Sequence, residues 1–314
     1  MRMLITGAAG FIGSNYVRKL LTGAYPRHTD THVTALDKLT YAGNPANLAA
    51  VADHPRLTFV TGDITDTHLL AALVPGHDAI INFAAETHVD RSITNAAAFL
   101  HTNTTGTQTL LDAALTARVP RFLQVSTDEV YGSITTGSWT EDHPLQPNSP
   151  YAASKAAGDL IARAYARTHR MNITITRCGN NYGPHQYPEK IIPLFITNLL
   201  DHQPVPLYGT GHNIRDWIHV DDHCRAIHLT LEKGAPGETY NIGGGTELTN
   251  RELTNRLLHA CDADPRLVHH VPDRPGHDHR YSLDDTKLRR LGYTPTTDFT
   301  TGLAATVDLS LIHI

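Results

Sequence analysis

Residues 6–13 read Thr6-Gly7-Ala8-Ala9-Gly10-Phe11-Ile12-Gly13, and this stretch decides the fold. It follows an apolar run from Met3 to Thr6, which predicts a strand, and it precedes a helical pattern from Ser14 to Leu21. Glycines at this spacing let the backbone turn tightly and approach a pyrophosphate, which the N-terminus of the helix faces with free N–H groups. The stretch therefore predicts a dinucleotide-binding turn, with an ordinary strand–helix turn as the alternative.

The first half of the chain alternates short apolar runs with helical stretches such as Thr105 to Ala117. Further strands are predicted at His32 to Leu36, Leu57 to Val60, Ala79 to Phe83 and Phe122 to Ser126. Apolar strands separated by helices are typical of a parallel sheet covered on both faces. The predicted fold is therefore α/β, a doubly wound parallel sheet of the Rossmann type.

Proline and glycine become frequent after about residue 180, which favours loops and short elements over continued regular winding. We therefore expect residues 1–180 to form the dinucleotide-binding domain. Residues 181–314 should form mainly a smaller C-terminal substrate-binding lobe, with the chain crossing back to the first domain.

Composition excludes several classes of function. The chain is 40% hydrophobic and 18% charged with a net charge of −5, which fits a globular protein and lacks the basic excess of a nucleic-acid binder. It has no run of about 18 apolar residues to span a membrane. Its start leaves no room for a secretory signal, and its three cysteines are far apart, so we expect a cytoplasmic protein. The 21 histidines are scattered without a metal-binding spacing, so no metal is predicted.

Two acidic residues follow the second and third predicted strands. Asp37 stands where a carboxylate can accept hydrogen bonds from a ribose hydroxyl and repel a 2′-phosphate, which favours NAD over NADP despite the neighbouring Lys38. Asp63 has two readings, a contact with the adenine edge or a cap on a helix that begins near Thr65.

Tyr151 and Lys155 form the pattern Y-x-x-x-K. Residues four apart share one face of a helix, so the lysine ammonium should lie near the phenol and lower its pKa. A phenol needs such help to act as a base near neutral pH. The alternative is a surface Tyr–Lys pair without a function. The glycine turn upstream and Ser126, about 25 residues before Tyr151, favour the catalytic interpretation.

Residues 126–132 read Ser126-Thr127-Asp128-Glu129-Val130-Tyr131-Gly132, just past the fifth predicted strand. Ligands bind at the carboxyl ends of strands in open α/β sheets, so this segment should reach the active site. Two adjacent carboxyl groups suit the elimination of water, which needs one proton removed and one donated. An exposed acidic turn is the alternative.

Together these features resemble the extended short-chain dehydrogenase/reductase family, and within it the dTDP-glucose branch of the nucleotide-sugar 4,6-dehydratases. Related epimerases usually carry a small or neutral pair where Asp128 and Glu129 stand. Further matching segments are Ala35 to Asn44, Ala84 to Ser92, Arg177 to Pro184, Pro188 to Lys190, Arg215 to Trp217 and Asp273 to Asp278. The resemblance runs from residue 3 to about 285.

The resemblance implies an NAD-dependent hydro-lyase acting on dTDP-glucose. Tyr151 and Thr127 would act at the sugar 4-hydroxyl, Glu129 would remove the C5 proton, Asp128 would protonate the departing 6-hydroxyl, and Lys155 would hold the nicotinamide ribose. Rivals are another nucleotide-sugar dehydratase, an epimerase, and a non-catalytic NAD-binding scaffold.

The resemblance also implies two sets of binding residues. Cofactor contacts are expected from Gly7, Gly10, Phe11, Ile12, Gly13, Asp37, Lys38, Leu39, Thr40, Asp63, Ile64, Ala84, Ala85, Thr102, Tyr151 and Lys155. Nucleotide-sugar contacts are expected from Thr87, His88, Asn180, Asn181, Lys190, Tyr208, Arg215, Asn250, Arg274, His277 and Tyr281. Asn250 could instead cap a helix, and Arg215 could instead pair with Asp216.

Two expectations concern the surface of the molecule. Family members form homodimers, here expected through the helices near Thr105 and Ser154. They usually end on an aromatic-rich amphipathic helix, which Gly302 to Val307 begins, but residues 308–314 depart from that pattern.

Overall fold

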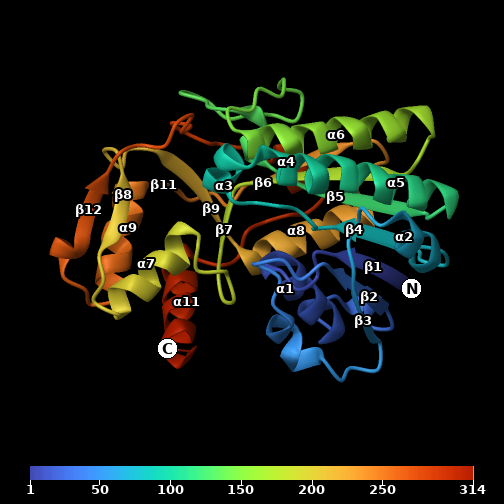
Figure 1. Cartoon of the computed structure of the whole chain (residues 1–314), viewed down its shortest axis with the longest axis horizontal. Helices are drawn as coiled ribbons and strands as arrows, with labels where there is room; N and C mark the ends of the chain where they lie inside the picture. The colour runs from blue at the N-terminus through green and yellow to red at the C-terminus, as the bar shows by residue number, and fades with distance from the viewer. Residues whose placement is uncertain (314) are drawn as a thin grey trace.

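The computed structural model describes residues 1–313, and within them a parallel sheet of seven strands forms the centre of the larger domain (Figure 1). Its order is β3-β2-β1-β4-β5-β6-β10. The strands are β1 (Arg2–Thr6), β2 (His32–Asp37), β3 (Leu57–Thr61), β4 (Ala79–Asn82), β5 (Arg121–Thr127), β6 (Ile173–Cys178) and β10 (Thr239–Ile242). The five predicted strands are confirmed to within one residue at each end, as is the Rossmann-type α/β fold. Strand order reverses between β1 and β4, the point where such sheets bind ligands.

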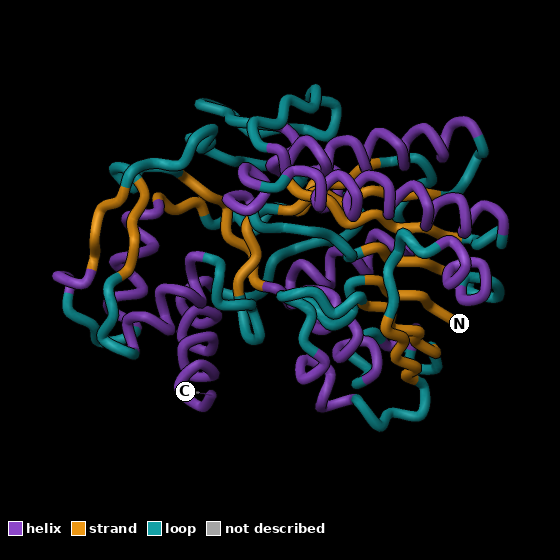
Figure 2. Tube along the Cα trace, viewed as in Figure 1, coloured by secondary structure: helices purple, strands orange, loops and turns teal. Residues whose placement is uncertain are grey.

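Helices cover both faces of this sheet (Figure 2). One face carries α2 (Thr67–Leu73), α5 (Thr107–Thr116) and α6 (Pro150–Thr168), and the other carries α1 (Phe11–Leu21) and α8 (Val220–Lys233). The predicted helix at Ser14 to Leu21 lies inside α1. The helix predicted from Thr105 begins as a π-helix, η3 (Leu100–Gly106), before it becomes α5. In the part of the chain that is described, no helix is long and apolar enough to cross a membrane.

Short helices and turns join these elements. They are η1 (Pro26–His28), η2 (Pro45–Val51), α3 (Val89–Thr94), α4 (Ala96–Phe99), η4 (Asp128–Tyr131), η5 (Pro265–Leu267) and α10 (Thr286–Arg289).

A smaller lobe follows β6 and has a hydrophobic core of its own, in which Phe195, Trp217 and Leu253 are buried. Its helices are α7 (Ile191–Leu200), α9 (Asn250–Ala260) and α11 (Phe299–His313). Its strands are β7 (Asn180–Tyr182), β8 (Val205–Tyr208), β9 (Ile214–His219), β11 (Glu247–Thr249) and β12 (Val268–Val271). Between β9 and β11 the chain returns to the large sheet as β10, which pairs with β6. The boundary at residue 180 itself stays a prediction, and α11 includes the backbone of residues 308–313.

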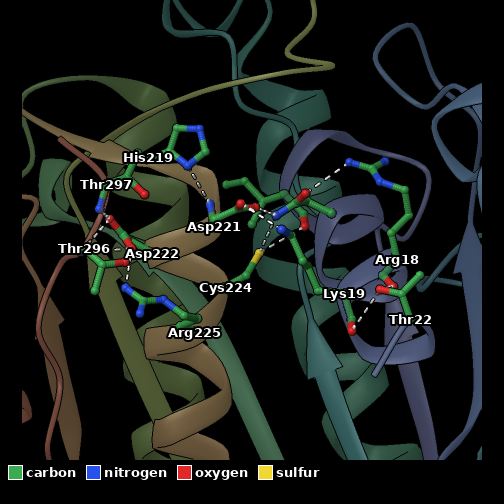
Figure 3. Close-up of polar contacts among 12 residues, drawn as sticks. Arg18, Lys19, Thr22, His219, Asp221, Asp222, Cys224, Arg225, Thr296 and Thr297 are labelled. Carbon is green, nitrogen blue, oxygen red and sulfur yellow. Dashed lines mark hydrogen bonds and ion pairs between the residues drawn. The ribbon is translucent and has the colours of Figure 1, made fainter. Parts of the chain in front are cut away.

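The N-terminus of α8 fastens the glycine-loop helix α1 to the segment that precedes α11 (Figure 3). Asp221 accepts a hydrogen bond from Asn15 Nδ2 at 2.9 Å and pairs with Lys19 Nζ at 2.8 Å. The next residue, Asp222, is buried and accepts from the backbone N–H of Thr297 at 2.9 Å. Two adjacent carboxylates therefore hold the large sheet and the smaller lobe to one helix.

Candidate active site

A cavity of about 470 Å³ lies along the carboxyl ends of strands β1 to β6 and continues under the smaller lobe. Its lining includes every residue predicted for catalysis or for nucleotide-sugar contact, and every predicted cofactor residue except Leu39. Leu39 adopts a left-handed backbone with φ 57°, and its N–H donates to Asp37 Oδ1 at 2.8 Å. Leu39 thus shapes the turn beside the cavity instead of lining it.

The glycine turn packs its backbone tightly against neighbouring segments, so that side chains at Gly7 and Gly13 would not fit. A Cβ at Gly7 would lie 2.7 Å from the backbone nitrogen of Ala84, and a Cβ at Gly13 would lie 2.2 Å from the carbonyl oxygen of Gly7. Gly10 occupies the N-cap of α1 and brings no side chain to the first N–H groups of that helix. This cradle of small residues at a positive helix end fits the pyrophosphate of a dinucleotide.

The acidic residues of the cofactor half have partners within the protein. Asp37 Oδ2 accepts from the backbone N–H of Ala9 at 2.8 Å, which fixes the carboxylate at the mouth of the turn. Asp63 Oδ2 pairs with Lys38 Nζ at 2.6 Å, so Lys38 is directed to Asp63. The capping alternative for Asp63 is wrong, because α2 begins at Thr67 and its cap is Asp66.

Tyr151 and Lys155 lie in the first turns of α6, and both are buried. Ser149 caps this helix by accepting from the N–H of Ala152 at 3.1 Å, and Pro150 at the first helical position suits the start of a helix. Lys155 Nζ donates to the carbonyl oxygen of Val125 at 2.7 Å. Helix α6 is thereby tied to β5, which ends at the acidic pair.

The expected lowering of the pKa of Tyr151 is wrong for the protein itself. Burial raises that pKa well above its ordinary value, and the negative charge of Glu129 raises it further, while a hydrogen bond with Thr127 opposes the shift. Burial also lowers the pKa of Lys155. Tyr151 and Lys155 both line the cavity, but desolvation is the largest influence on the pKa of the phenol.

Asp128 and Glu129 follow β5 directly and form the first turn of η4. Burial, then the charge of Glu129, raises the pKa of Asp128 well above its usual value. Asp128 Oδ2 is buried and lacks a hydrogen-bond partner among residues 1–313. Burial also raises the pKa of Glu129, but the charges of Arg274, Lys190 and Arg215 oppose that shift. The surroundings thus favour a protonated Asp128 and give more support to an ionised Glu129.

Three cationic side chains gather in the other half of the cavity. Lys190 Nζ donates to the carbonyl oxygen of Thr87 at 2.8 Å, and burial lowers the pKa of this lysine. Arg215 Nη2 donates to the carbonyl oxygen of Asp278 at 3.0 Å, and its guanidinium lies over the ring of Tyr281 at 4.2 Å. Arg274 Nε is buried without a hydrogen-bond partner in the described structure. Such a group of positive charges with an unused donor suits a diphosphate.

Two alternatives for this half are wrong. The cap of α9 is Thr249, which forms a reciprocal capping box with Glu252, so Asn250 is the first residue of the helix instead of its cap. Arg215 and Asp216 have separate partners, because Asp216 accepts from the backbone N–H groups of Gly244 and Thr246 at 2.9 and 3.0 Å.

Several other predicted substrate residues are held by carboxylates. His277 Nδ1 lies 2.6 Å from Asp273 Oδ1, and Tyr281 donates to Asp278 at 2.7 Å. Tyr208 donates to Asp90 at 3.3 Å. These contacts fix side chains from the end of β8 and from the segment 273–281.

Glu189 was not predicted as a site residue, although it lies in the matching segment Pro188 to Lys190. Glu189 lines the cavity, accepts a hydrogen bond from Tyr41 at 3.0 Å, and lies 3.8 Å from His88 Nε2. The guanidinium of Arg91 lies 3.7 Å above the Tyr41 ring. Ser126 was quoted but given no role in the site, and its buried hydroxyl lacks a partner within the described residues. The sequence did offer a signal for both residues: Glu189 is next to Lys190, and Ser126 lies two residues before the acidic pair.

The chain is similar to known proteins along nearly its whole length. The family model for GDP-mannose 4,6 dehydratase matches residues 4–306. A dTDP-glucose 4,6-dehydratase from Streptomyces niveus is 60% identical over 98% of this chain and 92% of its own length. DesIV, a dTDP-glucose 4,6-dehydratase from Streptomyces venezuelae solved with NAD bound, superposes with a TM-score of 0.98 at 61% identity, covering 99% of this chain and 97% of its own. A UDP-glucuronic acid 4-epimerase from Bacillus cereus solved with NAD has a TM-score of 0.94 at 28% identity, with full coverage of both chains. Fold likeness is therefore shared with epimerases, whereas high identity is seen with the dehydratases.

Proposed function

This chain belongs to the GDP-mannose 4,6 dehydratase family, and from that membership and its cavity we infer that it is an NAD-dependent dTDP-glucose 4,6-dehydratase. It converts dTDP-glucose to dTDP-4-keto-6-deoxyglucose with loss of water, a step toward deoxysugars. The observation that carries the inference is the placement of Asp128 and Glu129, which share one buried cavity with Tyr151 and Lys155. A site for hydride transfer and a site for water elimination therefore coincide.

The glycine turn, Asp37 and the α6 residues provide for the cofactor. NAD, when bound, supplies the acceptor and later the donor of one hydride. Tyr151 takes the proton of the sugar 4-hydroxyl as C4 is oxidised, and the hydroxyl of Thr127 hydrogen-bonds to the same oxygen. Because the protein alone raises the pKa of Tyr151, the positive charge that favours the phenolate must include charge brought in with the ligands.

Elimination of water uses the two carboxyl groups in opposite senses. The ketone at C4 acidifies the proton at C5, which Glu129 removes as a base. Asp128, whose pKa is raised by burial, gives its proton to the departing 6-hydroxyl, so that water leaves and a C5–C6 double bond forms. Residues of the smaller lobe, such as Trp217 and Tyr281, line one side of the cavity and limit the access of solvent to this reactive intermediate. The hydride would return from the bound cofactor to C6, and Glu129 would give the proton back to C5 to complete the product.

The nucleotide end of the substrate belongs in the cationic half of the cavity. We propose that Arg215, Arg274 and Lys190 bind the diphosphate, because their charges converge there and Arg274 Nε lacks a partner within the described chain. Eight polar side chains line the same half and would orient the nucleoside and the sugar. They are Thr87, His88, Asn180, Asn181, Tyr208, Asn250, His277 and Tyr281.

Incubation of the purified protein with dTDP-glucose tests the function. Mass spectrometry should show a nucleotide sugar lighter by one water, without net consumption of added NAD. UDP-, GDP- and CDP-glucose serve as parallel substrates. A product of unchanged mass but altered stereochemistry would indicate an epimerase. If only another nucleotide sugar is turned over, that sugar and not dTDP-glucose is the substrate. If denaturation releases bound NAD but no sugar is turned over, the protein is a non-catalytic scaffold.

We also propose a homodimer in which a second copy covers α5 and α6. These helices lie side by side on the outer face of the sheet (Figure 1). Leu160 of α6 and Leu100 of η3 are 53% and 49% exposed, which is high for large apolar side chains. Sedimentation should show a dimer that Leu160→Lys weakens and Phe59→Lys, at an exposed apolar residue of β3, leaves intact. A monomeric wild type would contradict the proposal.

A cytoplasmic location completes the proposed setting. Cys178, Cys224 and Cys261 are all free thiols, and the first two are buried, as expected of a protein kept in a reducing compartment. Recovery of the dehydratase activity in the cytosolic fraction of its cells would support this location, and recovery outside the cell would contradict it.

A further inference from the structure

A group of metal-ligating side chains lies outside the residues that line the cavity. It consists of His28 in η1 and of His228 and Glu232 in the last turns of α8. Their ligand atoms all lie within 4.8 Å of one another. His28 Nε2 is 3.3 Å from Glu232 Oε1, and His228 Nε2 is 3.8 Å from the same oxygen. Two imidazole nitrogens and a carboxylate oxygen therefore converge on one point.

The backbone brings these three residues together by two routes. His228 and Glu232 are four residues apart on α8 and so share one face of the helix. His28 arrives from the turn between α1 and β2, about 200 residues earlier in the sequence. No short motif therefore contains all three residues, and no metal was predicted from the sequence.

The ring of His228 is held in place on several sides. Its Nδ1 lies 2.9 Å from the hydroxyl of Tyr16, a fully buried residue of α1. The ring of Tyr25 stacks on it at 3.9 Å with an interplanar angle of 8°, and His28 meets it edge-on at 4.9 Å. A hydrogen bond on one ring nitrogen is the usual support for a histidine that binds a metal through the other.

We propose that His28, His228 and Glu232 form a binding site for a divalent transition-metal ion, of which zinc suits this donor set best. Zinc readily takes two imidazole nitrogens and one carboxylate oxygen, and water can fill the fourth tetrahedral position. In the ion's presence Nδ1–H of His228 donates to Tyr16, which leaves Nε2 for the metal. The ion fastens the turn between α1 and β2 to α8. Its role is structural, since none of the ligands lines the catalytic cavity.

Zinc titration of the full-length protein, first freed of metal with a chelator, tests the site. Calorimetry should show one saturable site, and zinc should raise the melting temperature where Mg²⁺ does not. His28→Ala and Glu232→Gln should each weaken zinc binding by at least about tenfold and abolish the rise. His32→Ala, which removes an exposed histidine outside the group, is the matched control and should bind zinc as the wild type does.

Tyr16→Phe provides a second test because it keeps the ring and all three ligands. Loss of the supporting hydroxyl should weaken zinc binding by roughly tenfold. If wild type shows no saturable binding, the three side chains form a hydrogen-bond and ion-pair network with Tyr16 donating to His228, and the proposal is wrong. It is equally wrong if both ligand variants bind zinc like the wild type, since scattered histidines then hold the metal. Turnover of dTDP-glucose by metal-free protein keeps the test independent of the proposed function.

Discussion

The two halves of the catalytic cavity are built in different ways. The cofactor half consists largely of backbone, with the glycine turn and the N-terminus of α1 placed by a single continuous stretch of sequence. The half assigned to the nucleotide sugar consists of charged and polar side chains from Thr87, His88 and several separate elements between residues 180 and 281. Catalytic carboxyl groups lie where the halves meet. Substitutions in the first half should therefore affect NAD binding by changing the shape of the backbone cradle. Substitutions in the second half should affect binding of the nucleotide sugar by changing the charge of that half.

Glu129→Gln should have the largest effect. It removes the proposed base for C5 while it keeps the size of the side chain, so turnover should fall by about 10²–10⁴-fold. Oxidation at C4 should survive, and NADH fluorescence should then accumulate on the enzyme without water loss. Glu238→Gln, on an exposed glutamate paired with Lys287, is the control and should turn over normally. Normal turnover by Glu129→Gln would refute the assigned role.

Gly7→Ala should break the cofactor half through shape alone. Gly7 has φ +64°, and an added Cβ would also lie within 3 Å of the backbone of Ala84. Gly23→Ala is the matched control, because Gly23 has φ +83° but open space around its Cβ position. The control should lose about 1–2 kcal/mol of unfolding free energy. Gly7→Ala should lose more unfolding free energy and should also lose bound NAD, measured after denaturing release. Equal losses of unfolding free energy in both variants would show that the clash with Ala84 has no effect.

Arg274→Ala should break the other half through charge. A hydrogen bond to a charged group contributes about 1.5–3 kcal/mol, so KM for dTDP-glucose should rise by about 10-fold or more. NAD content should not change, because the arginine lies in the nucleotide-sugar half. Arg266→Ala removes an arginine whose side chain is 90% exposed and should leave KM unaltered. A loss of NAD from Arg274→Ala would mean that the halves are not separable.

The smallest effect should separate structure from binding at the start of α9. Thr249→Ala removes the capping box with Glu252 and should lower the free energy of unfolding by about 1 kcal/mol at unchanged KM. Asn250→Ala keeps the cap and should instead raise KM. Denaturant unfolding and steady-state kinetics on both variants would show the opposite pattern if Asn250 were structural.

Local sequence patterns predicted the sheet well because its strands are short apolar runs bounded by turn residues. The carboxyl ends of those strands then located the acidic pair and Asp37. The pKa of Tyr151 could not be predicted in this way, since it depends on how deeply the folded chain buries the phenol. The partner of Lys155 is likewise a carbonyl 30 residues away on β5, which helix spacing does not reveal.

Long-range partners explain the remaining errors. Asp216 is held by the N–H groups of Gly244 and Thr246, so its sequence neighbour Arg215 was a poor guide. Glu189 gains its surroundings from residues near 41 and 91. Such contacts join segments with no common motif, and only the folded chain brings them together.

The late seventh strand has a consequence for how the protein is made. β10 pairs with β6 about 60 residues after β6 has been synthesised. At roughly 5–20 residues per second, the nascent chain exposes the unpaired backbone of β6 for several seconds. An open strand edge of this kind invites pairing with another chain. We therefore expect newly made copies to be most prone to aggregation before β10 emerges from the ribosome, and a fragment ending at residue 180 to stay insoluble although it carries the whole glycine turn.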